Sequence, residues 1–229
     1  MTFVIEPPEQ ISVAIVDGRR FPVRRIFCVG RNYADHVREM GNDPKSERPI
    51  FFTKPADAVV ESGATIAYPL NTANLHHEIE LVVAIGKGGV EIEARNAPEH
   101  IWGYGVGVDL TRRDRQNEAK KAGQPWDVAK AFDQSAPISA LTPRVQAGDV
   151  SKGRIWLSVN GEMKQNANLS EMIWSVPEII AVLSSSWRLA PGDLIFTGTP
   201  SGVGPLKPGD QVAGGIDGLS ELRFSITAR

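Results

Sequence analysis

The chain has 229 residues, with 25 Lys and Arg against 27 Asp and Glu, so its formal net charge is −2. This near balance offers no basic surface for nucleic acid or an acidic membrane. The single cysteine, Cys28, excludes an internal disulfide framework and a cysteine-rich zinc module. We expect no membrane span, because no apolar run approaches about 18 residues. We also expect no signal peptide, because the first residues carry acid and proline. A cytoplasmic protein is therefore expected.

The pattern of apolar residues predicts a mainly β (α+β) fold with a few short helices. The 22 Gly and 16 Pro indicate many turns between short strands, and Pro-Gly-Asp steps suit type II turns. A hairpin-like N-terminal arm is expected over residues 1–23 and one larger domain over 24–229. In chain order, helices are predicted over 33–40, 111–122 and 175–189, and strands over 155–159, 194–197 and 221–227. Ser175 and Glu178 fit a capping box, and Asn32 is a candidate N-cap.

The first candidate site residues are His36 and Glu39, on the predicted helix over 33–40. Residues i and i+3 share a helix face, and a carboxylate beside an imidazole orients it and raises its basicity. The pair could therefore activate a water molecule. The alternative is a solvated helix face. The polar stretch 41–48 that follows is expected to be a mobile surface loop.

A second candidate is the strand-like stretch that follows His76 and His77. Glu78 and Glu80 share one face of this strand because side chains alternate with a period of two. That face continues with apolar residues, so we expect burial on both faces. Two carboxylates beside a buried apolar run repel each other unless a cation lies between them. A divalent metal ion is one explanation, and a half-exposed strand is the other.

Asp109 offers a third carboxylate, at the end of a stretch with glycine at positions 103, 105 and 107. The bare strand face predicts close approach of a ligand or of another backbone. Three carboxylates favour Mg²⁺, Mn²⁺ or Ca²⁺ over zinc, while His76 and His77 keep zinc or iron open. The alternative is tight sheet packing, with Asp109 capping the next helix.

Four further residues could meet an anionic substrate. Lys130 stands among small and apolar residues and could neutralise a carboxylate or an enolate, unless it is a surface lysine. Arg113 and Gln116 lie one helical turn apart just after Asp109. Thr199 lies in a Gly-rich turn that could present backbone amides to an anionic oxygen. A plain tight turn is the alternative there.

In combination, these segments resemble the fumarylacetoacetate hydrolase family. The matching stretches occur in the family's order and span roughly residues 24–226. They are residues 30–36, 51–55, 77–81, 107–114, 130–133, 159–162 and 197–204.

The resemblance implies a mixed β-roll catalytic domain, a homodimer and one Mg²⁺ or Mn²⁺ ion per subunit. The metal ligands implied are Glu78, Glu80 and Asp109. The catalytic residues implied are His36 and Glu39, on a segment that orders over substrate, together with Lys130. The substrate-binding residues implied are Arg31, Tyr33, Arg113, Gln116 and Thr199.

The expected function is a metal-dependent hydrolase that cleaves a C–C bond of acylpyruvates, which are small 2-oxo acids, in aromatic-compound catabolism. Fumarylpyruvate is the substrate we expect. A water activated by His36 would attack the distal carbonyl and expel pyruvate enolate. One alternative is a decarboxylase or isomerase of oxaloacetate or of 5-carboxymethyl-2-hydroxymuconate-type diacids. Another is a non-catalytic domain that binds Ca²⁺ or a metabolite.

Overall fold

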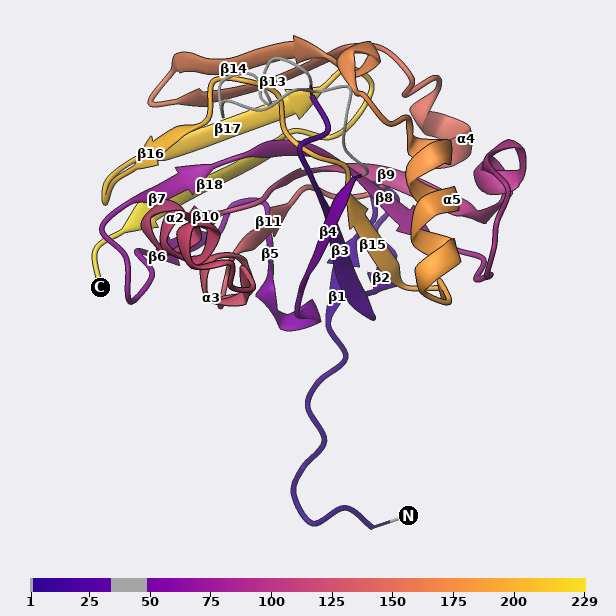
Figure 1. Ribbon diagram of the computed structural model, residues 1–229, viewed down its shortest axis with the longest axis horizontal. Coiled ribbons are helices and arrows are strands. Elements are labelled where there is room, and N and C mark those ends of the chain that lie inside the picture. Colours follow the sequence, from indigo (N-terminus) through magenta and orange to yellow (C-terminus); the bar gives the residue numbers. More distant parts are fainter. Residues whose placement is uncertain (1, 34–48) are drawn as a thin grey trace.

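A curved sheet of eight strands forms the centre of the fold, and a five-stranded sheet packs across one of its faces (Figure 1). The computed structural model describes residues 2–33 and 49–229. The large sheet runs in the order β4–β3–β15–β8–β9–β11–β5, and β12 also pairs with β9. Its strands are β3 (Arg25–Gly30), β4 (Ile50–Lys54), β5 (Val59–Glu61), β8 (Ile79–Ile85), β9 (Ile101–Val108), β11 (Ala136–Ile138), β12 (Thr142–Pro143) and β15 (Asp193–Phe196).

Smaller sheets complete the β structure. The five-stranded sheet runs in the order β14–β13–β17–β18–β6, a three-stranded sheet runs β10–β7–β16, and β1 pairs with β2. These strands are β1 (Ser12–Ala14), β2 (Arg20–Pro22), β6 (Thr65–Ala67), β7 (Leu75–His77), β10 (Thr111–Arg112), β13 (Arg154–Val159), β14 (Glu162–Asn168), β16 (Gly204–Leu206), β17 (Gln211–Ile216) and β18 (Leu222–Thr227). The mainly β roll with a few short helices is confirmed.

The helices are short. They are α2 (Arg113–Ala122), α3 (Asp127–Lys130), α4 (Arg144–Ala147), α5 (Val176–Ser186) and the 3₁₀ helices η1 (Ala56–Ala58), η2 (Ala94–His100) and η3 (Leu169–Glu171). In the described part of the chain no helix is long and apolar enough to cross a membrane.

The two long helices differ from their predicted bounds at one end each. Helix α2 ends where expected, since Gly123 adopts the left-handed conformation there, but it begins at Arg113 because Thr111 pairs with β7. Helix α5 has the predicted capping box of Ser175 and Glu178. It stops at Ser186 because Trp187 turns extended and packs its ring 5.5 Å from that of Phe27.

Strand β8 crosses the middle of the molecule with every residue buried. Ile79 and Leu81 belong to the core between the two large sheets, whereas Val82 and Ala84 belong to a second core on the opposite face. Burial on both faces, predicted from the sequence, is confirmed. The first residues of β8 therefore hold their side chains where water is excluded.

Two Pro-Gly-Asp turns adopt the predicted geometry. Gly192 has φ +93° and Gly209 has φ +97°. In each turn the Asp backbone amide donates to the carbonyl three residues earlier, with a distance of 3.1 Å for both Asp193 and Asp210. These are type II turns, in which glycine accepts the positive φ.

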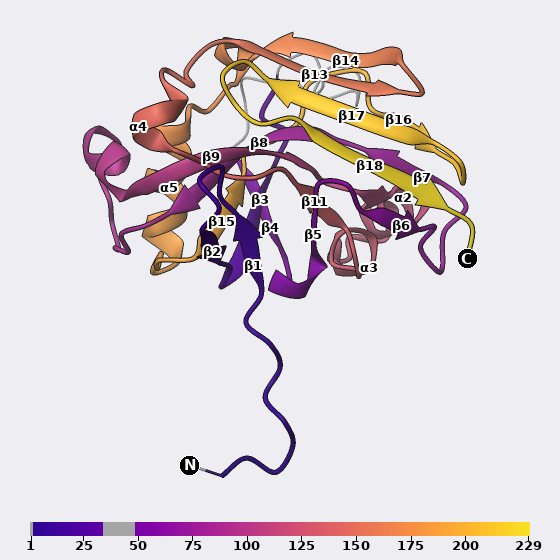
Figure 2. The same ribbon diagram turned by 180° about the vertical axis from the view of Figure 1, so that it is seen from behind.

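The N-terminal residues divide into two parts (Figure 2). The segment before β1 runs away from the body of the protein, with Phe3 and Val4 exposed. The hairpin β1–β2 instead packs onto the large sheet, because Val13 and Phe21 belong to the second core.

Candidate active site and metal centre

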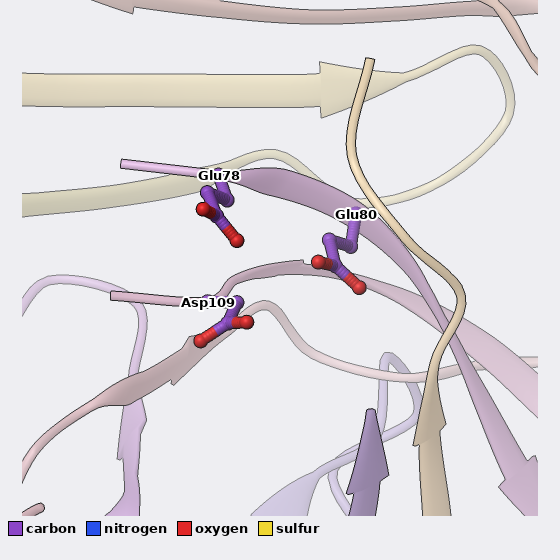
Figure 3. Close-up of side chains that lie close together, drawn as sticks. All are labelled: Glu78, Glu80 and Asp109. Carbon is purple, nitrogen blue, oxygen red and sulfur yellow. The ribbon is translucent and has the colours of Figure 1, made fainter. Parts of the chain in front are cut away.

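Three buried carboxylates meet where β8 begins and β9 ends (Figure 3). The two strands are antiparallel, with Glu80 opposite Gly107, and the Asp109 backbone amide donates to the Glu78 carbonyl oxygen at 2.8 Å. This register places Asp109 beside Glu78 and Glu80, although Asp109 is distant from them in the sequence. One oxygen from each of Glu78, Glu80 and Asp109 lies within 4.8 Å of the others. The predicted cluster is therefore present as a spatial group.

The glycines of β9 serve packing within the protein. A Cβ atom at Gly107 would lie 2.5 Å from a ring carbon of Phe196 and 2.6 Å from a methyl group of Val82. At Gly103 it would lie 2.4 Å from the Thr142 carbonyl oxygen. The bare face is thus covered by other parts of the chain. The expected close approach is made by another backbone, that of Thr142, and by side chains of the protein. The packing half of the alternative is therefore confirmed.

Two buried lysines bind Asp109. Lys130 Nζ lies 2.5 Å from Asp109 Oδ2 and 2.7 Å from Glu78 Oε2, and it donates to the Thr111 hydroxyl at 2.7 Å. Lys54 Nζ lies 2.8 Å from Asp109 Oδ1, an ion-pair distance, although the angle is not that of a hydrogen bond. Asp109 does not cap the following helix: the N-cap residue of α2 is Arg112, and the Arg115 amide in its first turn donates to Asp114 Oδ1.

The positive charge is unevenly distributed over the cluster. Glu78 contacts both Arg113 and Lys130, whereas Glu80 forms no ion pair with any described residue. Burial, followed by the charges of Asp109 and Glu78, raises the pKa of Glu80 well above its usual value. Burial alone would lower the pKa of Lys130, but Asp109 and Glu78 raise it. A further cation beside Glu80 would relieve this repulsion.

The two neighbouring histidines point to other partners. His77 Nδ1 lies 2.9 Å from the Gln165 side-chain oxygen, and His76 Nε2 lies 2.9 Å from that of Asn74. Burial, and then Arg113, lower the pKa of His76 to about 4. Over the described residues, the group that could hold a metal is three carboxylates without an imidazole. This donor set fits Mg²⁺ or Mn²⁺, which prefer oxygen ligands, and does not fit the zinc or iron alternative.

The Gly-rich turn after β15 supports the cluster directly. The Gly198 backbone amide donates to Glu80 Oε2 at 2.7 Å. The Thr199 hydroxyl accepts a hydrogen bond from Gln165 Nε2 at 2.9 Å. The turn thus presents a backbone amide to an anionic oxygen, as the sequence indicated, and this oxygen belongs to a carboxylate of the protein.

A narrow cavity of about 20 Å³ opens onto the carboxylates. Tyr33 does not line it: this residue is 1% exposed, and its hydroxyl has no hydrogen-bond partner within the described part of the chain. His36 and Glu39 lie outside the described residues. The other predicted catalytic and substrate-binding residues all line the cavity: Arg31, Arg113, Gln116, Lys130 and Thr199.

Comparison with known proteins shows which family this chain belongs to. The profile described as fumarylacetoacetate (FAA) hydrolase C-terminal matches residues 25–227. The chain belongs to the fumarylacetoacetate hydrolase family. The resemblance inferred from the sequence motifs is thereby confirmed.

Several members of this family are similar over nearly the whole chain. The crystal structure of fumarylpyruvate hydrolase from Pseudomonas aeruginosa in complex with Mn²⁺ and pyruvate is 49% identical, with a TM-score of 0.97 and 100% coverage of both chains. Fumarylpyruvate hydrolase of Ralstonia sp is 46% identical over 184 residues, 80% of this chain and 95% of that protein. Mitochondrial oxaloacetate tautomerase FAHD1 of Mus musculus is 46% identical over 203 residues, 89% of this chain and 91% of that protein.

No role for Lys54 could be predicted from the sequence. Its side chain is fully buried and pairs with Asp109. One feature of the sequence indicated burial of Lys54. It ends the apolar strand Ile50–Lys54, on the same face as Phe52. Gln165, which links His77 to the Gly-rich turn, had no such signal, because it stands among polar residues of an exposed strand.

Asn32, a candidate N-cap, binds two distant segments of the chain. Its side-chain amide donates to the Thr197 carbonyl at 2.7 Å and to the Trp174 carbonyl at 3.0 Å, and its oxygen accepts from the Trp174 amide at 2.7 Å. These bonds anchor the Gly-rich turn, while the helix that Asn32 was expected to cap lies outside the described residues. The helix predicted over 33–40 and the loop over 41–48 fall almost wholly outside the described residues.

Proposed function

We propose that this chain is a divalent-metal-dependent hydrolase that cleaves the C–C bond of acylpyruvates, with fumarylpyruvate as its substrate. The observation that carries the proposal is the buried cluster of Glu78, Glu80 and Asp109 with Lys130 beside it. It occurs in a chain that is 49% identical over its full length to a fumarylpyruvate hydrolase whose structure contains Mn²⁺ and pyruvate.

The residues of the cluster have separate tasks in this proposal. Glu78, Glu80 and Asp109 hold the cation, and the other side chains bind the substrate. When bound, a divalent cation would act as a Lewis acid that stabilises negative charge developing on the substrate. Lys130 lies beside the carboxylates, where its ammonium group stabilises the negative charge that develops on the leaving enolate. Arg113, hydrogen-bonded to Gln116, offers a guanidinium group to a substrate carboxylate.

The base in this proposal is His36, oriented by Glu39, as the sequence motif indicates. A proton passes from water to the His36 imidazole while the water oxygen bonds to the distal carbonyl carbon. The bond from that carbon to the methylene group then breaks, and its electron pair forms pyruvate enolate. A proton returned to the methylene carbon gives pyruvate, and the acyl part leaves as fumarate.

The product pattern from two substrates tests the proposal. Fumarylpyruvate and oxaloacetate are incubated separately with the purified protein and Mg²⁺, with and without EDTA. We expect equal amounts of pyruvate and fumarate from fumarylpyruvate, and no products with EDTA. Turnover of oxaloacetate alone would overturn the hydrolase proposal, and no turnover of either would favour a binding domain.

A second candidate function is isomerisation or decarboxylation of oxaloacetate. The observation that favours it is the 46% identity to oxaloacetate tautomerase. The same arrangement of three carboxylates and Lys130 would stabilise an enolate without an attacking water. A 5-carboxymethyl-2-hydroxymuconate-type diacid is an alternative substrate for the same chemistry.

We also propose an oligomeric state, a cellular location and a metabolic role for the protein. A homodimer, a cytoplasmic location and a role in aromatic-compound catabolism are supported by the family resemblance of the motifs. Sedimentation of the purified protein tests the first of these, because a homodimer would sediment at twice the mass of the 24.9 kDa chain.

A further inference from the structure

Two aromatic rings lead outward from the carboxylate cluster along the cavity wall. Lys130 Nζ lies 4.9 Å from the centre of the Phe52 ring. That ring is 5.8 Å from the ring of Trp126, at an interplanar angle of 58°. At the outer end, Lys120 Nζ lies 5.3 Å from the centre of the Trp126 ring. We call Phe52 and Trp126 the aromatic wall, and it connects a lysine at the cluster with a lysine away from it.

Lys120 belongs to the same face of α2 as two residues already placed at the site. Arg113, Gln116 and Lys120 are spaced i, i+3 and i+7, which puts them on one side of the helix. All three line the cavity. Helix α2 thus presents a row of polar side chains that begins at Arg113, which contacts Glu78, and ends at Lys120.

Lys120 differs from Lys130 and Arg113 in that no carboxylate of the described residues pairs with it. Lys130 and Arg113 both contact Glu78. Within the described residues, Lys120 forms no ion pair and no hydrogen bond, and its ammonium group lies over the Trp126 ring. Burial, then Arg113 and Arg31, lower the pKa of Lys120 to about 8. An anionic group in this part of the cavity would offset the repulsion between these cations.

We propose that the aromatic wall and Lys120 form the subsite for the distal end of the substrate, and that this subsite selects a flat, unsaturated acyl group that ends in a carboxylate. The proposal rests on the proposed function, since it assigns the end of the substrate away from the metal. A conjugated acyl group stacks favourably on aromatic rings. An ammonium group at the end of the wall pairs with a terminal carboxylate.

The subsite separates substrates by length and charge. Acetylpyruvate has the same reacting carbonyl groups but no second carboxylate. The second carboxylate of oxaloacetate lies one carbon from its oxo group, and so it stays beside the metal ligands. Fumarylpyruvate carries its second carboxylate beyond a trans double bond, at the far end of the acyl group. Lys120 therefore matters for fumarylpyruvate and not for the other two.

Steady-state kinetics of Lys120 variants test the assignment. Fumarylpyruvate and acetylpyruvate are compared with wild type, Lys120→Met, Lys120→Arg and the control Lys121→Met, which changes the exposed neighbouring lysine. We expect Lys120→Met to lower kcat/KM for fumarylpyruvate roughly 10- to 100-fold, the value of a charge-assisted hydrogen bond. The change should lie mainly in KM. Acetylpyruvate kinetics should stay within about twofold, since no such bond is lost. Lys120→Arg should keep most of the activity, and Lys121→Met all of it.

The outcomes separate the two proposals. A loss shared equally by both substrates, or no loss for either, would overturn the role of Lys120 while leaving the hydrolase proposal intact. A wild-type protein that hydrolyses neither substrate would overturn the proposed function. Thermal unfolding of each variant, with and without Mn²⁺, shows whether a loss of activity comes from a loss of folding or of metal binding.

Discussion

The Gly198 backbone amide donates a hydrogen bond to the Glu80 carboxylate at 2.7 Å, and this contact fixes the one carboxylate of the cluster that lacks an ion pair in the described structure. Gly198 has φ +98°, and a Cβ atom there would lie 2.6 Å from Cβ of Asn32. The turn after β15 and the side chain of Glu80 are therefore constrained together. A substitution in the turn should therefore weaken metal binding even though all three carboxylates are kept.

Gly198→Ala should weaken metal binding, and Gly209→Ala is its matched control. Gly209 has φ +97° but no atom within 4 Å of a Cβ placed there, so alanine at that position tests backbone strain alone. Each variant should lose about 1–3 kcal/mol of unfolding free energy from strain. Gly198→Ala should lose more, and its Mn²⁺ affinity should fall roughly 10- to 100-fold, as for other groups that orient a metal ligand. Calorimetric Mn²⁺ titration would contradict this if both variants bound equally well.

Two amide substitutions within the cluster should differ in their effect on the metal-free protein. Glu80→Gln removes a charge that has no ion-pair partner among the described residues, while the amide oxygen can still accept from Gly198. Asp109→Asn leaves Lys54 and Lys130 without their shared partner, and breaking a buried pair costs about 3–5 kcal/mol. In urea unfolding with EDTA, Glu80→Gln should be as stable as wild type or more stable, and Asp109→Asn clearly less. Both should lose the rise in Tm that Mn²⁺ produces. Equal destabilisation of the two would count against the charge distribution described for this site.

Substitution of His36 should separate catalysis from metal binding. His36→Ala removes the proposed base, which should lower kcat for fumarylpyruvate roughly 10²- to 10⁴-fold. Mn²⁺ affinity should stay near that of wild type, because the three carboxylates hold the ion. Glu39→Gln should cost less, since it removes the group that orients the imidazole and not the base itself. An unchanged kcat in His36→Ala would remove this residue from the mechanism.

The preference for fumarylpyruvate over acetylpyruvate should decline at high pH. Burial, Arg113, Arg31 and Lys130 lower the pKa of Lys120, Glu78 raises it, and the result is about 8. As the pH rises through this value, Lys120 loses its proton and no longer attracts the distal carboxylate. The ratio of the two kcat/KM values should therefore fall above about pH 8, and effects common to both substrates cancel in that ratio. Lys120→Arg should keep the ratio constant, because guanidinium stays charged; a wild-type ratio independent of pH would contradict the prediction.

The residues of the metal centre could be predicted because two of them lie on one strand. Glu78 and Glu80 alternate along β8, and the apolar residues after them indicated burial on both faces. Asp109 was identified at the end of a strand with alternate glycines, and antiparallel pairing of β8 with β9 brings it to the same place. Close approach to those glycines was predicted, but not the group that makes it, because the sequence does not show that Phe196 packs against Gly107.

Contacts between distant segments could not be predicted. Gln165 joins His77 to the turn at Thr199, and neither partner is near it in the sequence. The position of Lys120 over Trp126 depends on how the chain folds back after α2 ends at Gly123. In both cases local periodicity gives the strand or the helix, whereas the partner of the side chain depends on tertiary structure.

The most direct test of the central claim is a titration of Mn²⁺ into EDTA-stripped protein, with pyruvate release from fumarylpyruvate as the readout. The claim is that one divalent cation, held by Glu78, Glu80 and Asp109, is required for cleavage of the C–C bond. We expect no release without metal, a rise that saturates at one ion per chain, and no rise in Glu80→Gln. Equal release from the stripped and the loaded protein, or a normal titration in Glu80→Gln, would contradict it.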